Sequence, residues 1–115
     1  MLTFSEFRMA NKDRCESPAG FNHKLQDWSA SDWMTAVIGG LGEAANIIKK
    51  FNRSRDGIPG NKQSDNELRY KLRKELGDVF VYLDLLCQSQ GFNLDDAAVE
   101  VFNSKSMEIG YPRLL

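Results

Sequence analysis

The stretch that decides the fold is Glu75-Leu76-Gly77-Asp78-Val79-Phe80-Val81-Tyr82-Leu83-Asp84-Leu85-Leu86, residues 75–86. Glu75 and Asp78 are three residues apart and Tyr82 follows one turn later, so on a helix all three share a face. Acidic side chains rarely lie near a core unless they are paired or bound to a metal ion. Because apolar residues flank this line, we expect it to point into a cleft, and it is the first place to look for chemistry.

The apolar residues around this stretch recur at helical spacing and extend it in both directions. A capping-box pattern at Ser64 to Glu67 predicts the start of the helix, and Gly91 predicts its end. Its expected inward positions are Leu68, Leu72, Leu76, Val79, Leu83 and Leu86. The same spacing predicts a second long helix from Ser29 or Ser31 to about Phe51. Its expected buried stripe is Met34, Val37, Ile38, Leu41, Ala44, Ala45, Ile48 and Phe51.

Two shorter helices complete the pattern. The first should run from about Ser5 to Glu16, ending before Ser17-Pro18-Ala19-Gly20. The last should be capped by Asn93 and run to about Met107, with Ala97, Ala98, Val101 and Phe102 facing inward. The polar loop over 52–64 is long for a compact helical domain, which is typical of a mobile or functional loop. The prediction is one all-α domain over 1–115, bundle-like, with antiparallel long helices two and three.

The overall composition limits the classes of function and the location that we expect for the protein. The 115 residues carry a net charge of −1, which gives no global reason to expect a nucleic-acid partner. Local clusters of Lys and Arg, at Lys49, Lys50, Arg53, Arg55 and Arg69 to Lys74, leave a local anion site open. The apolar runs are too short for a membrane span, and the amino terminus lacks the apolar core of a signal peptide. Cys15 and Cys87 show no metal-type spacing, so we expect reduced thiols and a cytoplasmic protein.

A glycine-rich segment, Gly40-Leu41-Gly42-Glu43-Ala44-Ala45, matches a permissive dinucleotide-binding fingerprint. That function needs a second apolar strand soon after the helix, and this chain instead enters a polar loop at Asn52. We therefore reject it and keep the segment helical. Each glycine at 39, 40 and 42 costs about 1 kcal/mol relative to alanine, which favours close approach of a neighbouring helix or a ligand.

If the two long helices are antiparallel neighbours, Glu43 can face Glu75 and Asp78. Three converging carboxylates repel one another unless a cation lies between them, and oxygen-only ligands suit Mg²⁺ or Mn²⁺. Candidate contacts to substrate phosphates lie nearby, namely Asn46, Lys49, Lys50 and Lys74. The alternative is that Glu43 and Glu75 are surface charges paired with lysines.

These residues resemble the MazG-like nucleotide pyrophosphohydrolases. The resemblance rests on Gly42-Glu43-Ala44-Ala45-Asn46 with Lys49-Lys50, followed about 30 residues later by Glu75-Leu76-Gly77-Asp78-Val79, and runs from about Trp28 to Ser106. It implies an all-α dimer or tetramer that hydrolyses nucleoside triphosphates to the monophosphate and pyrophosphate. In that family acids of a Glu-Glu-x-x-Glu and a Glu-x-x-Asp motif bind Mg²⁺, and a metal-activated water attacks the α-phosphorus.

One departure from the family pattern bears on catalysis. Gly39 and Gly40 stand where the first motif has glutamates, and position 40 normally keeps its acid. Carried over, Glu43, Glu75 and Asp78 remain, and one metal ligand or the general base is missing. Such a loss commonly lowers the rate at least about 10²-fold. The alternatives to a weak enzyme are a nucleotide-binding or regulatory protein that lost catalysis and a helical self-association module.

Candidates for nucleobase contacts lie before the second helix and near the end of the chain. The resemblance places the base near His23 and Trp28, with Trp33 more typical of core packing. Tyr82 could line the pocket or pack in the core. By resemblance, Asn103 and Lys105 lie in a segment that reaches a neighbouring active site, so they are candidate base or phosphate contacts.

Overall fold

The computed structural model describes residues 1–115, and all of its regular structure is helical. It contains α1 (Phe4–Glu16), the 3₁₀ turn η1 (Leu25–Asp27), α2 (Ala30–Arg55), α3 (Asp65–Ser89) and α4 (Leu94–Ile109). The all-α prediction is therefore confirmed. No helix has both the length and the apolar character that a membrane crossing needs.

The helix ends follow the local sequence. Thr3 forms a reciprocal capping box with Glu6 at the start of α1. The Ser64 hydroxyl accepts a hydrogen bond of 3.2 Å from the Glu67 N–H, as the capping signal predicts. After α3 the chain passes through Gly91 at φ 81°, and α4 ends at Gly110 at φ 73°, both in the left-handed conformation that glycine tolerates best.

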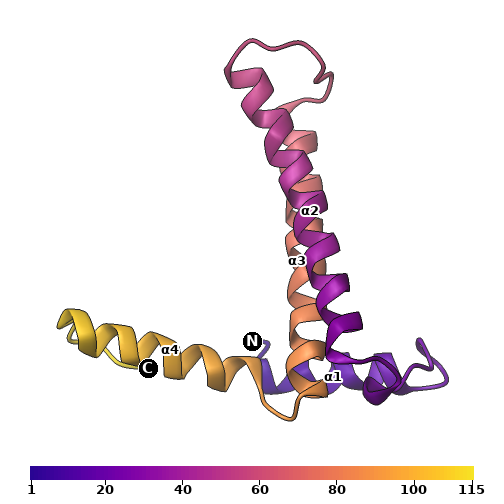
Figure 1. The fold of residues 1–115 in the computed structure, drawn as a ribbon, viewed down its shortest axis with the longest axis vertical. Helices are drawn as coiled ribbons and strands as arrows, with labels where there is room; N and C mark the ends of the chain where they lie inside the picture. The colour runs from indigo at the N-terminus through magenta and orange to yellow at the C-terminus, as the bar shows by residue number, and fades with distance from the viewer. The chain divides into compact units, whose positions relative to one another are not determined.

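The chain divides into two compact units, which are described separately. Unit 1 comprises Met1–Ala30 and Asp84–Leu115, and unit 2 comprises Ser31–Leu83. Unit 2 is a helical hairpin in which α2 and α3 lie side by side, joined by a loop (Figure 1). The two helices are antiparallel because Trp33 lies near Tyr82, whereas Gly40 meets Val79 further along α2 and earlier in α3.

The buried face of α2 differs from the predicted stripe. The buried residues are Trp33, Val37, Gly40, Ala44 and Ile47. Only Val37 and Ala44 belong to the predicted set, and the prediction is wrong for the exposed residues Met34, Ile38, Leu41, Ala45 and Ile48. The helix carries two adjacent apolar lines at the same spacing, so periodicity alone could not tell which line faces α3. Gly40 lies on the line that faces α3, where a Cβ atom would lie 2.8 Å from Val79 Cγ2.

Smaller corrections apply to α3 and α4. Leu76 lies one position outside the inward line of α3 and is 47% exposed, although Leu68 is fully buried and Leu86 is buried. In α4 the predicted inward residues Ala98, Val101 and Phe102 are exposed, and Ser106 is the one buried residue of that helix. These apolar side chains of α4 are exposed, so the periodicity predicted the helix correctly but not its buried face.

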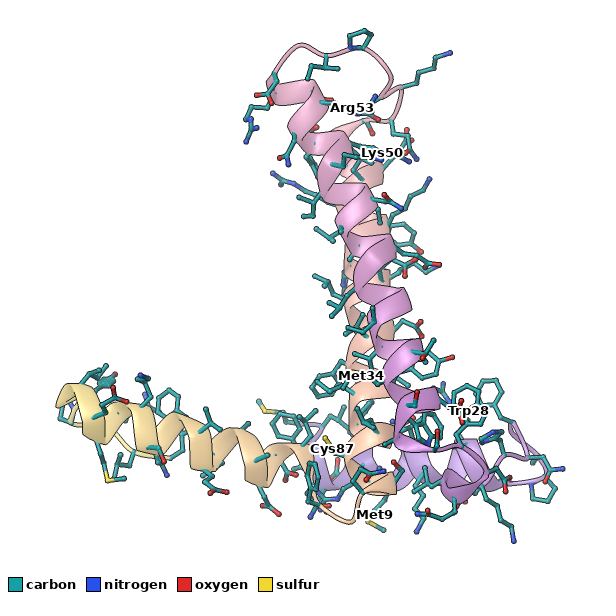
Figure 2. All side chains as sticks on the ribbon, in the orientation of Figure 1. Met9, Trp28, Met34, Lys50, Arg53 and Cys87 are labelled. Atoms are coloured by element: carbon teal, nitrogen blue, oxygen red, sulfur yellow. The ribbon has the colours of Figure 1, made fainter.

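The core of unit 1 combines apolar and polar side chains. Its apolar part includes Cys15, Leu25, Leu85, Leu86 and Cys87. Both cysteines are free thiols, as predicted. Figure 2 shows every side chain on the ribbon, with Cys87 labelled on the last turns of α3.

Candidate functional site

Two of the three predicted acids, Glu43 and Glu75, interact across the hairpin of unit 2. Glu43 projects from α2, and Glu75 and Asp78 project from α3. Glu75 is half-buried on the line of α3 that faces α2, whereas Glu43 and Asp78 are exposed. The expectation that the acid line is enclosed by apolar residues is therefore met only in part, at Glu75.

The pKa of the Glu75 carboxyl is raised above its ordinary value. The largest cause is a side-chain hydrogen bond with Glu43, followed by partial desolvation and by the negative charges of Glu43 and Asp78, while Lys74 opposes the shift. Two carboxyl groups this close cannot both ionise easily unless a proton or a cation lies between them. This pairing of Glu43 with Glu75 is the strongest chemical feature of the hairpin.

The donor set fits part of a coordination shell for a hard divalent cation. Mg²⁺ is commonly held by one or two carboxylates, with water and substrate phosphates supplying the other oxygens. No group of three or more His, Cys, Asp and Glu side chains converges tightly enough in the structure to hold a metal ion. The hairpin therefore brings two predicted ligands, Glu43 and Glu75, into contact and leaves Asp78 in their electrostatic neighbourhood.

Gly40 has a packing role that the sequence only suggested. A Cβ atom built on Gly40 would lie 2.8 Å from Cγ2 of Val79, whereas one built on Gly39 or Gly42 would meet nothing within 4 Å. Valine is stiff at χ1, so Cγ2 cannot move aside freely. Close helix approach thus explains the glycine at 40, and an acid at this position would require Val79 to shift.

The candidate phosphate contacts lie along the same hairpin. Lys49 and Asn46 are exposed on α2. Lys50 donates a hydrogen bond of 3.0 Å from Nζ to Gln63 Oε1, and Arg53 bonds the Pro59 carbonyl oxygen at 3.3 Å. These two side chains lie at the loop end of α2 (Figure 2) and hold the loop over 56–64 against the helix. Lys74 lies over the Tyr70 ring, with Nζ 5.5 Å from the ring centroid.

The aromatic candidates have different environments. Trp33 is buried, with its ring centroid 6.4 Å from that of half-buried Tyr82, so Trp33 packs in the core as expected. His23 and Trp28 belong to unit 1 and form an edge-to-face pair at 4.9 Å between centroids. The Cys15 thiol donates to the His23 carbonyl oxygen at 3.0 Å, which fixes the backbone next to Asn22, a non-glycine residue at φ 52°.

The residues near the end of the chain are engaged locally in unit 1. The Asn103 side chain makes two hydrogen bonds with the backbone of Leu115, accepting at 2.8 Å and donating at 3.2 Å. Lys105 pairs with Glu108 at 2.9 Å on the exposed side of α4. Their roles in binding a base or phosphate stay predictions.

Sequence reasoning missed the carboxylate that is truly buried. Asp84 is only 3% exposed, and one of its oxygens accepts hydrogen bonds of 2.9 Å from both Asn11 and Gln88. Gln88 also donates to the Arg8 carbonyl oxygen, and Arg8 pairs with Asp95 at 2.7 Å. The signal was an acid within Leu83-Asp84-Leu85-Leu86, the most apolar part of the run. The rule that near-core acids need partners applies to Asp84 better than to Asp78.

Comparison with known proteins adds an independent finding. The family model of the MazG nucleotide pyrophosphohydrolase domain matches residues 29–106, which is more than half of the chain. Searches of curated proteins and of solved structures gave no match. The matched region contains α2, α3 and almost all of α4, and therefore Glu43, Glu75 and Asp78. The chain thus belongs to the MazG nucleotide pyrophosphohydrolase family.

Proposed function

We propose that this protein is a Mg²⁺-dependent hydrolase that cleaves the α–β phosphoanhydride of nucleoside triphosphates, releasing the nucleoside monophosphate and pyrophosphate. What carries the proposal is the interaction of Glu43 with Glu75 across the hairpin, which raises the pKa of the Glu75 carboxyl. Membership of the family supports the nucleotide substrate and a divalent metal. The buried free thiols suit a reducing compartment such as the cytoplasm.

In this proposal Glu43 and Glu75 would hold the divalent cation, with Mn²⁺ as a substitute, and Asp78, the third predicted ligand, would contribute its negative charge from the same stretch of α3. When bound, the cation supplies Lewis-acid polarisation and neutralises phosphate charge. Glu43 or Glu75 would accept the proton of the attacking water. Asn46, Lys49, Lys50 and Lys74 would bind phosphate oxygens.

Base recognition is proposed for a second set of side chains. The edge-to-face pair of His23 and Trp28 supplies aromatic rings for contact with a base. Tyr82, Asn103 and Lys105 are further candidates. Release of Asn103 from the Leu115 backbone would be needed before its amide could contact a nucleotide.

The second candidate function is a nucleotide-binding or regulatory protein with impaired catalysis. The packing of Gly40 on Val79 favours it, because a glutamate ligand at this position has no ready space. This alternative predicts that nucleotide plus Mg²⁺ stabilises the protein against heat without hydrolysis. A helical self-association module is a third candidate, and it predicts no metal binding.

We further propose that the protein self-associates as a dimer or tetramer. In an antiparallel pair of helices, the residues that follow the buried residues by one position lie on the same side of both helices. On this side lie the exposed apolar side chains of Met34, Ile38, Leu41 and Ile48 from α2 and of Leu76 and Phe80 from α3. A contiguous apolar face formed by two helices is typical of an interface. Light scattering of an Ile38→Glu variant, with Thr35→Glu as the control, should show loss of the oligomer.

A pyrophosphate-release assay tests the activity. Each nucleoside triphosphate is incubated with the protein and Mg²⁺, and pyrophosphate and orthophosphate are measured separately. We expect pyrophosphate release that falls at least about 10²-fold in Glu75→Gln, while Glu100→Gln, an exposed acid of α4, is unaffected. Absence of turnover for every nucleotide, together with nucleotide-dependent stabilisation, would select the second candidate function. Absence of both effects would refute the first two candidates.

A further inference from the structure

The net charge of −1 conceals a strong segregation of charge along the chain. Residues 49–74, which we call the basic end, span the last turns of α2, the loop and the first turns of α3. They contain nine of the fifteen Lys and Arg residues and three of the sixteen Asp and Glu residues, for a net charge of +6. The rest of the chain therefore carries a net charge of −7. All of the basic end belongs to unit 2.

Few of these cations are neutralised by acidic partners. Arg55 pairs with Asp56, and this is the one ion pair within the basic end. Lys50 and Arg53 bond neutral oxygens of the loop. Arg69 and Arg73 are exposed and form no ion pair. Such clustered, uncompensated charge creates a local potential that attracts polyanions even when the overall charge is near zero.

An exposed aromatic ring lies among these cations on α3. Tyr70 is 63% exposed, and Arg69, Arg73 and Lys74 surround it at helical positions on the solvent side. Lys74 already contacts the Tyr70 ring face at 5.5 Å. We call these four residues the basic patch. Leu68 and Leu72 mark the face of α3 that packs on α2, so the patch lies away from that contact.

We propose that the basic patch binds single-stranded nucleic acid. The phosphate backbone is the complementary polyanion for Arg69, Arg73 and their neighbours, and Tyr70 supplies a platform on which a base stacks. A triphosphate bound near Glu43 and Glu75 would engage Lys74, as proposed above, and would leave Arg69, Tyr70 and Arg73 without a ligand. The overall net charge does not indicate a nucleic-acid partner, because it averages over two oppositely charged parts of the chain.

Fluorescence anisotropy with a labelled oligo(dT) of about 20 nucleotides tests the proposal at salt concentrations from about 50 to 200 mM NaCl. We expect binding that weakens with salt. The double variant Arg69→Gln/Arg73→Gln should reduce the slope of log K against log salt by about 1.4, at about 0.7 per lost phosphate contact. Tyr70→Ala should weaken binding about 5- to 150-fold.

Matched controls separate this surface from the proposed nucleotide site. Lys12→Gln/Arg113→Gln removes the same charge from exposed positions of unit 1 and should leave binding unchanged. Glu43→Gln should also leave it unchanged, so failure of the hydrolase proposal does not affect this test. The proposal is overturned if the wild-type protein does not bind the oligonucleotide at low salt, if both charge variants weaken binding equally, or if a duplex of the same length binds as tightly.

Discussion

Gly40 is the residue at which the packing of the hairpin can be tested most sharply. At an open position inside a helix, replacing glycine by alanine stabilises by about 1 kcal/mol, because the unfolded chain loses freedom and the helix gains a better former. Gly39 and Gly42 are such positions, since an added Cβ meets no atom within 4 Å. At Gly40 the added Cβ would lie 2.8 Å from Val79 Cγ2. Overpacking of this kind costs about 1–3 kcal/mol.

The two effects oppose each other only at Gly40. We therefore expect Gly40→Ala to destabilise by about 0–2 kcal/mol, whereas Gly39→Ala and Gly42→Ala each stabilise by about 1 kcal/mol. Urea denaturation at one protein concentration, followed by helical circular dichroism, measures all three variants against the wild-type protein. Equal stabilisation by Gly40→Ala and Gly39→Ala would refute the argument that close helix approach selects this glycine.

A double-mutant cycle identifies the atom responsible. Val79→Ala removes Cγ2, so Gly40→Ala made in that background should lose most of its penalty. The coupling between the two substitutions should be about 0.5–3 kcal/mol. The same reasoning applies to Gly40→Glu, which should gain activity more readily when combined with Val79→Ala than alone.

Two further predictions concern the core of unit 1. Asp84→Ala should lower the free energy of unfolding in urea by about 1–3 kcal/mol, because it leaves the Asn11 amide without its buried acceptor. Asp84→Asn keeps an acceptor oxygen and should lower it less. Equal losses in the two variants would contradict the role assigned to Asp84. Burial raises the pKa of the Cys15 and Cys87 thiols, with the charges of Glu16 and Asp84 as the next causes. The folded protein thus holds the thiol protons more tightly than the unfolded chain does. The stability that this tighter proton binding contributes is fully present below the thiol pKa of the unfolded chain, and it is lost as the pH rises through the thiol pKa of the folded protein. We expect Ellman's reagent at pH 8 to react far more slowly with the folded protein than in urea, and equal rates would show accessible thiols.

The helices could be predicted from the sequence because their signals are local. Capping at Ser64, the stop at Gly91 and the apolar period depend on neighbouring residues only, and each helix was found within a few residues of its place. The buried face of α2 could not be predicted in the same way. Two apolar lines run along that helix, and the choice between them depends on a partner helix and on which glycine it approaches.

The candidate site shows the same division between local and long-range information. The spacing of Glu75 and Asp78 and the motif around Glu43 led to the acids that meet across the hairpin. The sequence could not show that Asp78 is exposed and that Asp84 is the buried carboxylate, because α1 supplies Asn11 from 73 residues away. The partners of a buried polar group are a tertiary property, and the apolar run signalled only that one of its acids needed them.

Calorimetric titration of the protein with Mn²⁺ and Mg²⁺ tests the central claim most directly, since it requires neither turnover nor a known nucleotide. If Glu43 and Glu75 form half of a divalent cation site, the wild-type protein and Glu100→Gln should bind the ion, and Glu43→Gln and Glu75→Gln should each weaken binding at least about tenfold. A wild-type protein that binds neither ion, or variants that bind as tightly as the wild type, would contradict the claim.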